Sequence, residues 1–297
     1  MGLRGKPSQR QRRLGAELRR MREDVGLTAT KAGAEVGLSA AHLNHIEAGR
    51  TSISPEKIRG LAAFCGCKQE RLIESLIAMS QSNGRGWWSE YEHPPHNQAV
   101  RDLAELESMS VRLRAFQWVN VPGMLQTPEY MRALFKAGHP DMPAENREQF
   151  VEFRLRRQRL LTDPKPPEFH AVIHEAALRM EFVGREVMQR QVEHMVEMAC
   201  LPHVKIQILP FRTEAYPGGF GCSFVCFDAA VAELSTVYVE HPASSPFVID
   251  QSNLAQFSDA FANLGAVALP PIAPGAASNV SVRRDSLGLI QRLMYDL

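Results

Sequence analysis

Residues 39–45 hold the side chains of this chain that are best placed to bind the bases of a nucleic acid. The segment 27–50 reads as two short helices joined by one tight turn, and a helix presented in this way fits the DNA major groove, which is about 12 Å wide. The residues that would face the groove are Ser39, Ala40, Ala41, His42, Asn44 and His45. Because alanine offers only a methyl group for contact with thymine, we expect the polar readout from Asn44 or His45.

Five further polar residues around the same segment are candidates for contacts with DNA phosphates. They are Thr28, Lys31, Arg50, Thr51 and Arg12. Phosphate contacts fix the register and orientation of a protein on the duplex but read no sequence. The alternative interpretation, for these residues and for residues 39–45, is an ordinary solvated surface.

The two short helices have start and turn signals at the spacing that such an arrangement requires. Thr28 and Ser39 are predicted N-cap residues, whose hydroxyls accept a free backbone N–H of the first turn. Gly37 supplies the backbone freedom that a sharp turn needs, and Gly49 can end the second helix. The residues expected to face inward are Ala32, Val36, Leu43 and Ile46.

Three more helices complete a predicted N-terminal domain over residues 1–82. Residues 9–24 and 68–80 repeat apolar side chains at helical spacing. Between them, Ser54 followed by Pro55 is a typical helix start. The sequence therefore predicts five helices in about 80 residues, followed by a polar linker that leads into a second domain.

The net charge of the chain, +1 at neutral pH, is the sum of a basic N-terminal part and an acidic remainder. Residues 1–82 contain 14 Lys or Arg against 8 Asp or Glu, a net +6, and residues 83–297 contain 20 against 25, a net −5. A basic domain gains nucleic-acid affinity from counterion release. Six arginines crowd the first helix and its approach, and we interpret them as part of a DNA-binding surface rather than as a solvated helix face. They are Arg10, Arg12, Arg13, Arg19, Arg20 and Arg22.

Length and composition indicate a globular chain of more than one domain. With 297 residues, 44% of them hydrophobic and 23% charged, the chain has enough length for a sizeable core. No stretch approaches the roughly 20 apolar residues of a membrane span, and no apolar signal-peptide core follows the basic N-terminus. The five cysteines form no paired framework, which favours reduced thiols. We therefore expect a cytoplasmic protein that associates with the nucleoid.

Residues 83–297 mix helical and strand-like patterns and predict a larger α+β domain with a small sheet. Strands are expected at 116–121, 169–175, 204–209, 222–228 and 236–241. Helices are expected at 97–116, 128–138, 144–162, 185–200, 251–269 and 284–295. The fold class predicted for the whole chain is thus mainly α in the first domain and α+β in the second.

The second domain also contains residue types that occur in enzymes, but their spacing does not indicate a catalytic site. His170 and His174 share one face of a strand while Glu175 points to the other face, which disfavours a compact metal site. Cys222 near His241 could imitate a Cys-His pair, although its alternation with apolar residues fits the buried face of a strand. We therefore assign no catalytic residue, no metal ligand and no cofactor, and expect that the chain is not an enzyme.

The motifs of both domains resemble those of known regulators. The first 80 residues resemble phage-repressor-like, Xre-type helix-turn-helix domains. In the second domain, the resemblance is to the C-terminal domain of an actinomycete regulator family that includes the WhiJ-like proteins of sporulating bacteria. The segments that carry it are Trp87 with Trp88, 121–127, 201–210, 217–219 and 237–240. The resemblance implies a DNA-binding transcription regulator that is modulated through its C-terminal domain, and it names no reaction.

Three hypotheses follow for the function. The leading one is a sequence-specific regulator of double-stranded DNA, acting as a homodimer. The resemblance implies control by a small acidic protein encoded nearby, in an arrangement likened to antitoxin and toxin, with a role in development. The alternative is a one-component regulator whose C-terminal domain senses a small-molecule ligand. The third is an enzyme tethered to DNA.

Overall fold

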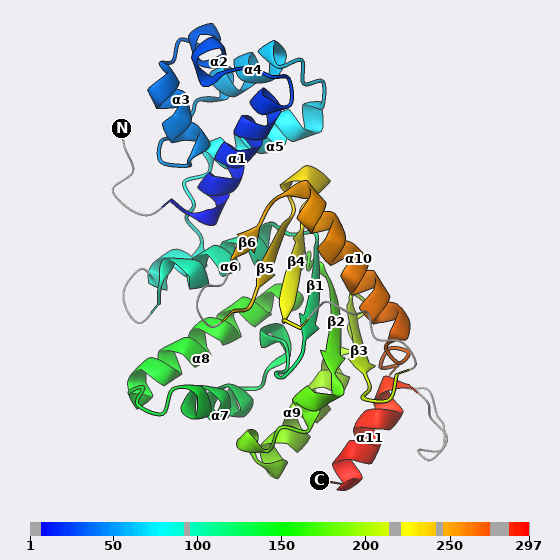
Figure 1. The fold of residues 1–297 in the computed structure, drawn as a ribbon. Coiled ribbons are helices and arrows are strands. Elements are labelled where there is room, and N and C mark those ends of the chain that lie inside the picture. The colour runs from blue at the N-terminus through cyan, green and yellow to red at the C-terminus, as the bar shows by residue number, and fades with distance from the viewer. Residues whose placement is uncertain (1–6, 92–95, 214–220, 242–245, 274–284, 297) are drawn as a thin grey trace. The chain divides into compact units, whose positions relative to one another are not determined.

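The structure is a computed structural model in which the chain forms two compact units (Figure 1). It describes residues 7–91, 96–213, 221–241, 246–273 and 285–296. The first unit is Met1–Met109 together with Ala229–Leu234, and the second is Ser110–Asp228 together with Ser235–Leu297. None of the described helices is long and apolar enough to span a membrane.

The first unit is helical. Its α-helices are α1 (Gln9–Glu23), α2 (Ala29–Glu35), α3 (Ala40–Glu47), α4 (Pro55–Phe64), α5 (Glu70–Gln81) and α6 (Gln98–Met109), with a 3₁₀-helix, η1 (Trp87–Tyr91), before α6. The five predicted N-terminal helices are therefore confirmed. The compact unit continues through α6, beyond residue 82, where we predicted the boundary between the domains, and that boundary stays a prediction.

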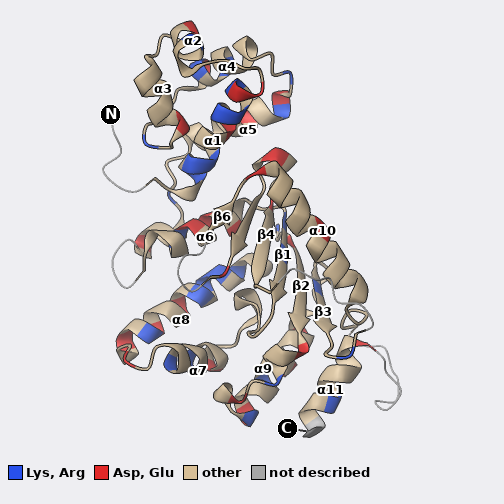
Figure 2. Cartoon of the chain, viewed as in Figure 1, with Lys and Arg blue, Asp and Glu red and all other residues tan. Residues whose placement is uncertain are grey.

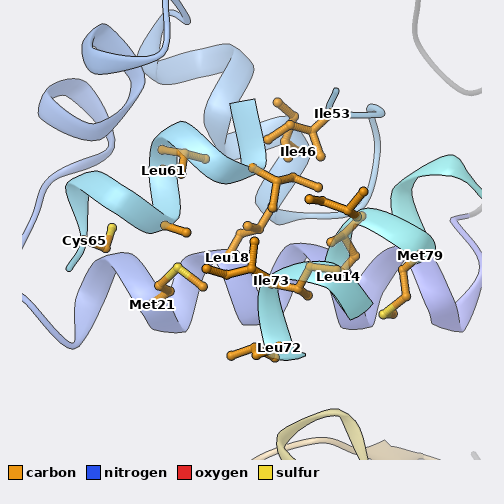
Figure 3. Close-up of a cluster of buried hydrophobic side chains, with 14 of the residues drawn as sticks. Leu14, Leu18, Met21, Ile46, Ile53, Leu61, Cys65, Leu72, Ile73 and Met79 are labelled. Carbon is orange, nitrogen blue, oxygen red and sulfur yellow. The ribbon is translucent and has the colours of Figure 1, made fainter. Parts of the chain in front are cut away.

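A single cluster of apolar side chains holds helices α1 to α5 together (Figure 3). Its members come from distant parts of the first unit, among them Leu18, Ile46, Leu61 and Ile73. Burying one such side chain stabilises the fold by about 2 kcal/mol. Of the residues predicted to face inward, only Val36 is not fully buried, because it packs at the edge of the cluster.

Residues 229–234, which connect two strands of the second unit, also belong to the first unit. Val231 and Leu234 are partly buried and pack against the apolar cluster of helices α1 to α5. The first unit is therefore not continuous in sequence.

Helix α1 approaches the end of α3 so closely that glycine is required at the contact. A Cβ atom added at Gly15 would lie 2.5 Å from the carbonyl oxygen of Ile46 and closer still to that of Glu47. Gly49 has a φ of +70°, and a Cβ there would lie 2.9 Å from the backbone nitrogen of Arg12. Backbone atoms cannot move aside cheaply, so these two glycines permit the packing of α3 on α1.

A buried ion pair fixes the same contact. Arg22 of α1 donates from Nε to Glu47 Oε1 (2.7 Å) and from Nη2 to Glu47 Oε2 (2.8 Å). Its remaining Nη1 donates to the carbonyl oxygen of Leu27 at 2.7 Å, just before α2 begins. The hydrogen bond to Glu47 raises the pKa of Arg22, so the guanidinium stays charged. One side chain therefore links α1, the start of α2 and the end of α3.

The second unit contains a mixed six-stranded sheet in the order β3-β2-β1-β4-β5-β6. Its strands are β1 (Arg112–Gln117), β2 (Glu168–His174), β3 (Val204–Leu209), β4 (Phe224–Asp228), β5 (Thr236–Val239) and β6 (Phe247–Val248). Strands β1, β2 and β3 pair in parallel, and the other neighbours pair antiparallel. The predicted α+β domain with a sheet is therefore confirmed.

Two predicted boundaries near the first strand are wrong. The helix expected at 97–116 ends at Met109, and the strand expected at 116–121 is β1, Arg112–Gln117. Pairing with β2 on one side and β4 on the other holds residues 112–117 extended, against their local helical pattern. The short β6 was not predicted, because two residues show no alternation.

Helices cover the sheet. Helices α7 (Pro128–Gly138) and α8 (Ala144–Gln158) connect β1 to β2, and α9 (Arg185–Met198) connects β2 to β3. Helix α10 (Gln251–Val267) runs along the sheet (Figure 1) and buries apolar side chains against Phe116, Val172 and Phe224. The last described helix is α11 (Ser286–Asp296). The motif expected at 217–219 lies outside the described residues.

Removing one partner of the buried ion pair tests its role. We expect Arg22→Met to lower the free energy of unfolding of the first unit by about 3 kcal/mol, because Glu47 would be left charged and buried without its partner. The control is Arg19→Met, since Arg19 lies in the same helix but forms its ion pair with an exposed Glu23. Loss of helical circular dichroism in urea measures both, and equal midpoints would contradict the assigned role.

Candidate nucleic-acid interface

Helix α3 begins at a capped N-terminus that follows a sharp turn. The hydroxyl of Ser39 accepts from the backbone N–H of His42 at 3.2 Å, and the hydroxyl of Thr28 accepts from that of Lys31 at 3.3 Å. Gly37 between the two helices has a φ of +66°. The predicted caps and turn are therefore confirmed, and they define where α2 ends and α3 begins.

All six residues predicted to face DNA bases lie on α3 or at its cap. Ser39, Ala41, His42, Asn44 and His45 are exposed, and Ala40 is half-buried. The opposite side of the helix is anchored in the core by Leu43 and Ile46, which are 1% and 2% exposed. The helix thus presents one polar surface that carries no acidic side chain, because its only carboxylate, Glu47, is buried.

The predicted phosphate contacts lie at both ends of this helix pair. Thr28 and Lys31 are exposed in the first turn of α2, Arg50 is exposed after α3, and Thr51 next to it is half-buried. Arg12 differs from these four residues because it already has an acidic partner in the protein. Its Nη2 lies 3.6 Å from the buried carboxylate of Asp102. Its charge is already partly compensated within the protein.

The interpretation of the six α1 arginines as part of a DNA-binding surface is wrong for the three that are buried. Arg10, Arg13 and Arg22 are buried, and each forms an ion pair with a buried glutamate. Arg19 and Arg20 also form ion pairs on or near the same helix, and Figure 2 shows acidic residues beside the basic ones along α1. The buried charges of Arg10, Arg13 and Arg22 stabilise the fold of the first unit and are not available to DNA, whereas Arg19 and Arg20 are paired but remain at least partly exposed to solvent.

Sequence reasoning missed a lysine that fixes the turn. Lys57 of α4 donates from Nζ to the carbonyl oxygen of Val36 at 2.8 Å, with a longer contact of 3.4 Å to that of Gly37. A cation at this position satisfies carbonyl groups at the C-terminal end of α2 and interacts favourably with the helix dipole. No local signal could have identified Lys57, because its partners lie 20 residues away and more.

The histidines considered as metal ligands do not converge. His170 bonds through Nε2 to Gln207 Oε1 at 2.8 Å, whereas His174 stacks on Trp118 with ring centroids 4.4 Å apart. Glu175 accepts from the backbone N–H of Phe211 at 2.8 Å. Among the described residues, no group of three or more His, Cys, Asp or Glu side chains could hold a metal ion.

The cysteine considered as a nucleophile is not activated. Burial raises the pKa of the half-buried Cys222 thiol, which makes it a weaker nucleophile at neutral pH. Cys222 also lies outside β4, which begins at Phe224, so the strand predicted at 222–228 starts two residues later. The predicted alternation holds within the strand, where Phe224 and Cys226 are buried.

Comparison with known protein families agrees with this geometry. Residues 13–76 match a family described as a helix-turn-helix domain, the domain type that is characteristic of DNA-binding regulators. Residues 100–273, more than half of the chain, match a domain of unknown function, DUF5753, and the chain belongs to that family. No curated protein and no solved structure matches the chain.

The protonation of His170 predicts how stability depends on pH. Burial lowers the pKa of His170 to about 4, whereas the ordinary value is about 6.5. Between these values the unfolded chain binds a proton that the folded chain does not, so stability falls as the pH is lowered. As the pH is lowered through this interval, we expect the free energy of unfolding of His170→Gln to fall less than that of the unchanged protein. Urea denaturation at several pH values measures both. The control is the exposed His139→Gln, and parallel curves for all three proteins would contradict the prediction.

Proposed function

We propose that the protein is a sequence-specific transcription regulator that binds double-stranded DNA through α3. The observation that carries this proposal is the exposed polar surface of α3, anchored by Leu43 and Ile46 and held by the Arg22–Glu47 pair. A rigidly held helix with free polar side chains at its first turns is what insertion into the major groove requires. Such a regulator acts in the cytoplasm, on the DNA of the nucleoid.

Within this proposal, each of the six residues of the α3 surface makes a different kind of contact with the DNA bases. Asn44 carries an amide that can bond to adenine, His45 is the second polar reader, and Ala40 and Ala41 contact thymine methyl groups. Ser39 and His42 lie at the start of the helix, where it enters the groove. Thr28, Lys31, Arg50 and Thr51 contact phosphates on either side, with Arg12 as the weakest candidate because of its contact with Asp102.

Two copies of α3, one from each subunit of a dimer, would supply more sequence specificity than a single copy can. A single α3 offers few polar groups for base contacts, since two of its groove-facing residues are alanines. We therefore propose a homodimer that binds a pseudo-palindromic site, with half-sites about one helical turn apart.

Control is proposed to act through the second unit. The resemblance of its motifs to those of WhiJ-like actinomycete regulators, which often occur beside a small acidic protein, supports a protein partner in the manner of an antitoxin. A second candidate is control by a small molecule. The observation that favours it is a cleft of about 680 Å³ in the second unit, a volume that is typical of ligand sites.

Substitution of a phosphate contact should weaken all complexes alike. We expect Arg50→Ala to lower affinity by a similar factor for every DNA sequence and to reduce the slope of log affinity against log salt by about 1. The matched control is Arg59→Ala, an exposed arginine of α4 that forms ion pairs with Glu70 and Glu74. Fluorescence anisotropy at several salt concentrations measures both, and an unchanged slope in Arg50→Ala would contradict the assignment.

Substitution of a base contact should instead change the preferred sequence. We expect Asn44→Ala to cost about 1–3 kcal/mol at one base position and to relax the preference there. The measurement is selection of bound duplexes from a pool of random sequence. It compares the sequences enriched by the full-length unchanged protein, by Asn44→Ala and by His45→Ala. If the unchanged protein enriches no sequence, the proposed function is wrong. If it enriches one that neither substitution alters, the assignment of the readers is wrong.

A further inference from the structure

A row of nitrogen-bearing side chains crosses the three parallel strands of the second unit. The strand register pairs Arg114 of β1 with His170 of β2, and His170 with Lys205 of β3. Residues paired in this way project from the same face of a sheet. Two cations and an imidazole therefore stand side by side near the N-terminal ends of β1 to β3.

This row lines a cleft between the sheet and α10. The cleft has a volume of about 680 Å³, and its lining includes Arg112, His170, Lys205, Phe261 and Gly265. Flat groups form part of its wall: the rings of His170 and Phe261 meet edge to face at 4.8 Å, and the guanidinium of Arg114 lies 5.6 Å from the Phe261 ring centre. The cleft has the volume of a small-molecule site, and its wall combines cationic and aromatic side chains.

Hydrogen bonds fix which nitrogen of His170 carries the proton. Gln207 donates from Nε2 to the carbonyl oxygens of Gly265 (3.1 Å) and Leu269 (3.0 Å), so its Oε1 must accept. The partner of that oxygen is His170 Nε2, which therefore donates at 2.8 Å. A neutral imidazole that donates from Nε2 has an acceptor at Nδ1. His170 thus offers a hydrogen-bond acceptor of fixed position.

The charges of the cleft are unevenly compensated. Asp228 forms ion pairs with Arg112 (2.7 Å) and with Arg114 (2.8 Å), and Arg114 also donates to Ser258 at 3.0 Å. Lys205 has no hydrogen-bond or ion-pair partner among the described residues. Of the lining residues that the structure describes, Glu168 is the only carboxylate, at the exposed edge next to Arg112 in the register. The Lys205 side of the cleft is therefore the place where an anion would be stabilised.

We propose that this cleft binds a small aromatic carboxylic acid whose ring carries a hydroxyl or amino group. Its carboxylate pairs with Lys205, its ring packs against Phe261, and its hydroxyl or amino group donates to Nδ1 of His170. This site lies in the second unit, apart from the residues proposed to contact DNA, and it gives a ligand class to the small-molecule alternative for control.

The test uses the full-length protein and 4-hydroxybenzoate as the probe, with the uncharged 4-hydroxybenzamide as its matched analogue. Isothermal titration should show saturable binding of the acid and at least about tenfold weaker binding of the amide. Lys205→Met should weaken the acid about tenfold, whereas Lys136→Met, an exposed lysine of α7, should leave it unchanged.

A second pair of variants tests the cleft itself without removing a charge. A Cβ at Gly265 would lie 3.7 Å from Gln207 Oε1 and 3.8 Å from His170 Cε1, which is ordinary contact, so Gly265→Ala should fold and bind. Gly265→Leu should fill the cleft and abolish binding, with circular dichroism confirming that both variants are folded. No saturable binding at millimolar acid, or binding that Lys205→Met and Gly265→Leu leave intact, would overturn the proposal. Neither result would affect the DNA-binding proposal.

Discussion

The buried pair of Arg22 and Glu47 is the interaction on which the position of the exposed surface of α3 depends. A guanidinium and a carboxylate that are both removed from water are stable only while they remain paired. Because the same arginine also bonds to the carbonyl of Leu27, it sets the start of α2 as well as the end of α3. The glycine at position 15 allows the backbones to come close enough for this pair to form. The position of α3 is therefore fixed by the contacts of its buried residues with the rest of the first unit.

Local features of the fold could be predicted from the sequence because they depend on residues within one helical turn. The caps at Thr28 and Ser39 and the positive φ of Gly37 are of this kind. Features that depend on residues far away in the chain could not be predicted from the sequence. Residues 112–117 form a strand only because β2 and β4 flank them, and nothing in their own pattern reveals those neighbours.

At the candidate site, too, the local features could be predicted and those that depend on distant residues could not. The exposed face of α3 follows from helical periodicity, so its residues could be identified in advance. The prediction was wrong for the three buried arginines of α1 because a run of basic residues does not reveal where its partner carboxylates lie. One of those carboxylates, Glu105, is 95 residues from Arg10. His170 was considered as a metal ligand, yet its role depends on Gln207, 37 residues further along the chain.

The discontinuity of the first unit has a consequence for exchanging its helices with those of another protein. Val231 and Leu234 pack against its helical core, and Arg10 needs Glu105 as its buried partner. An exchange of coding segments with a breakpoint near residue 82 would leave apolar surface uncovered and a buried guanidinium without its carboxylate. Joined to a different second domain at that point, the helices of residues 9–81 would therefore be less stable than they are in this chain.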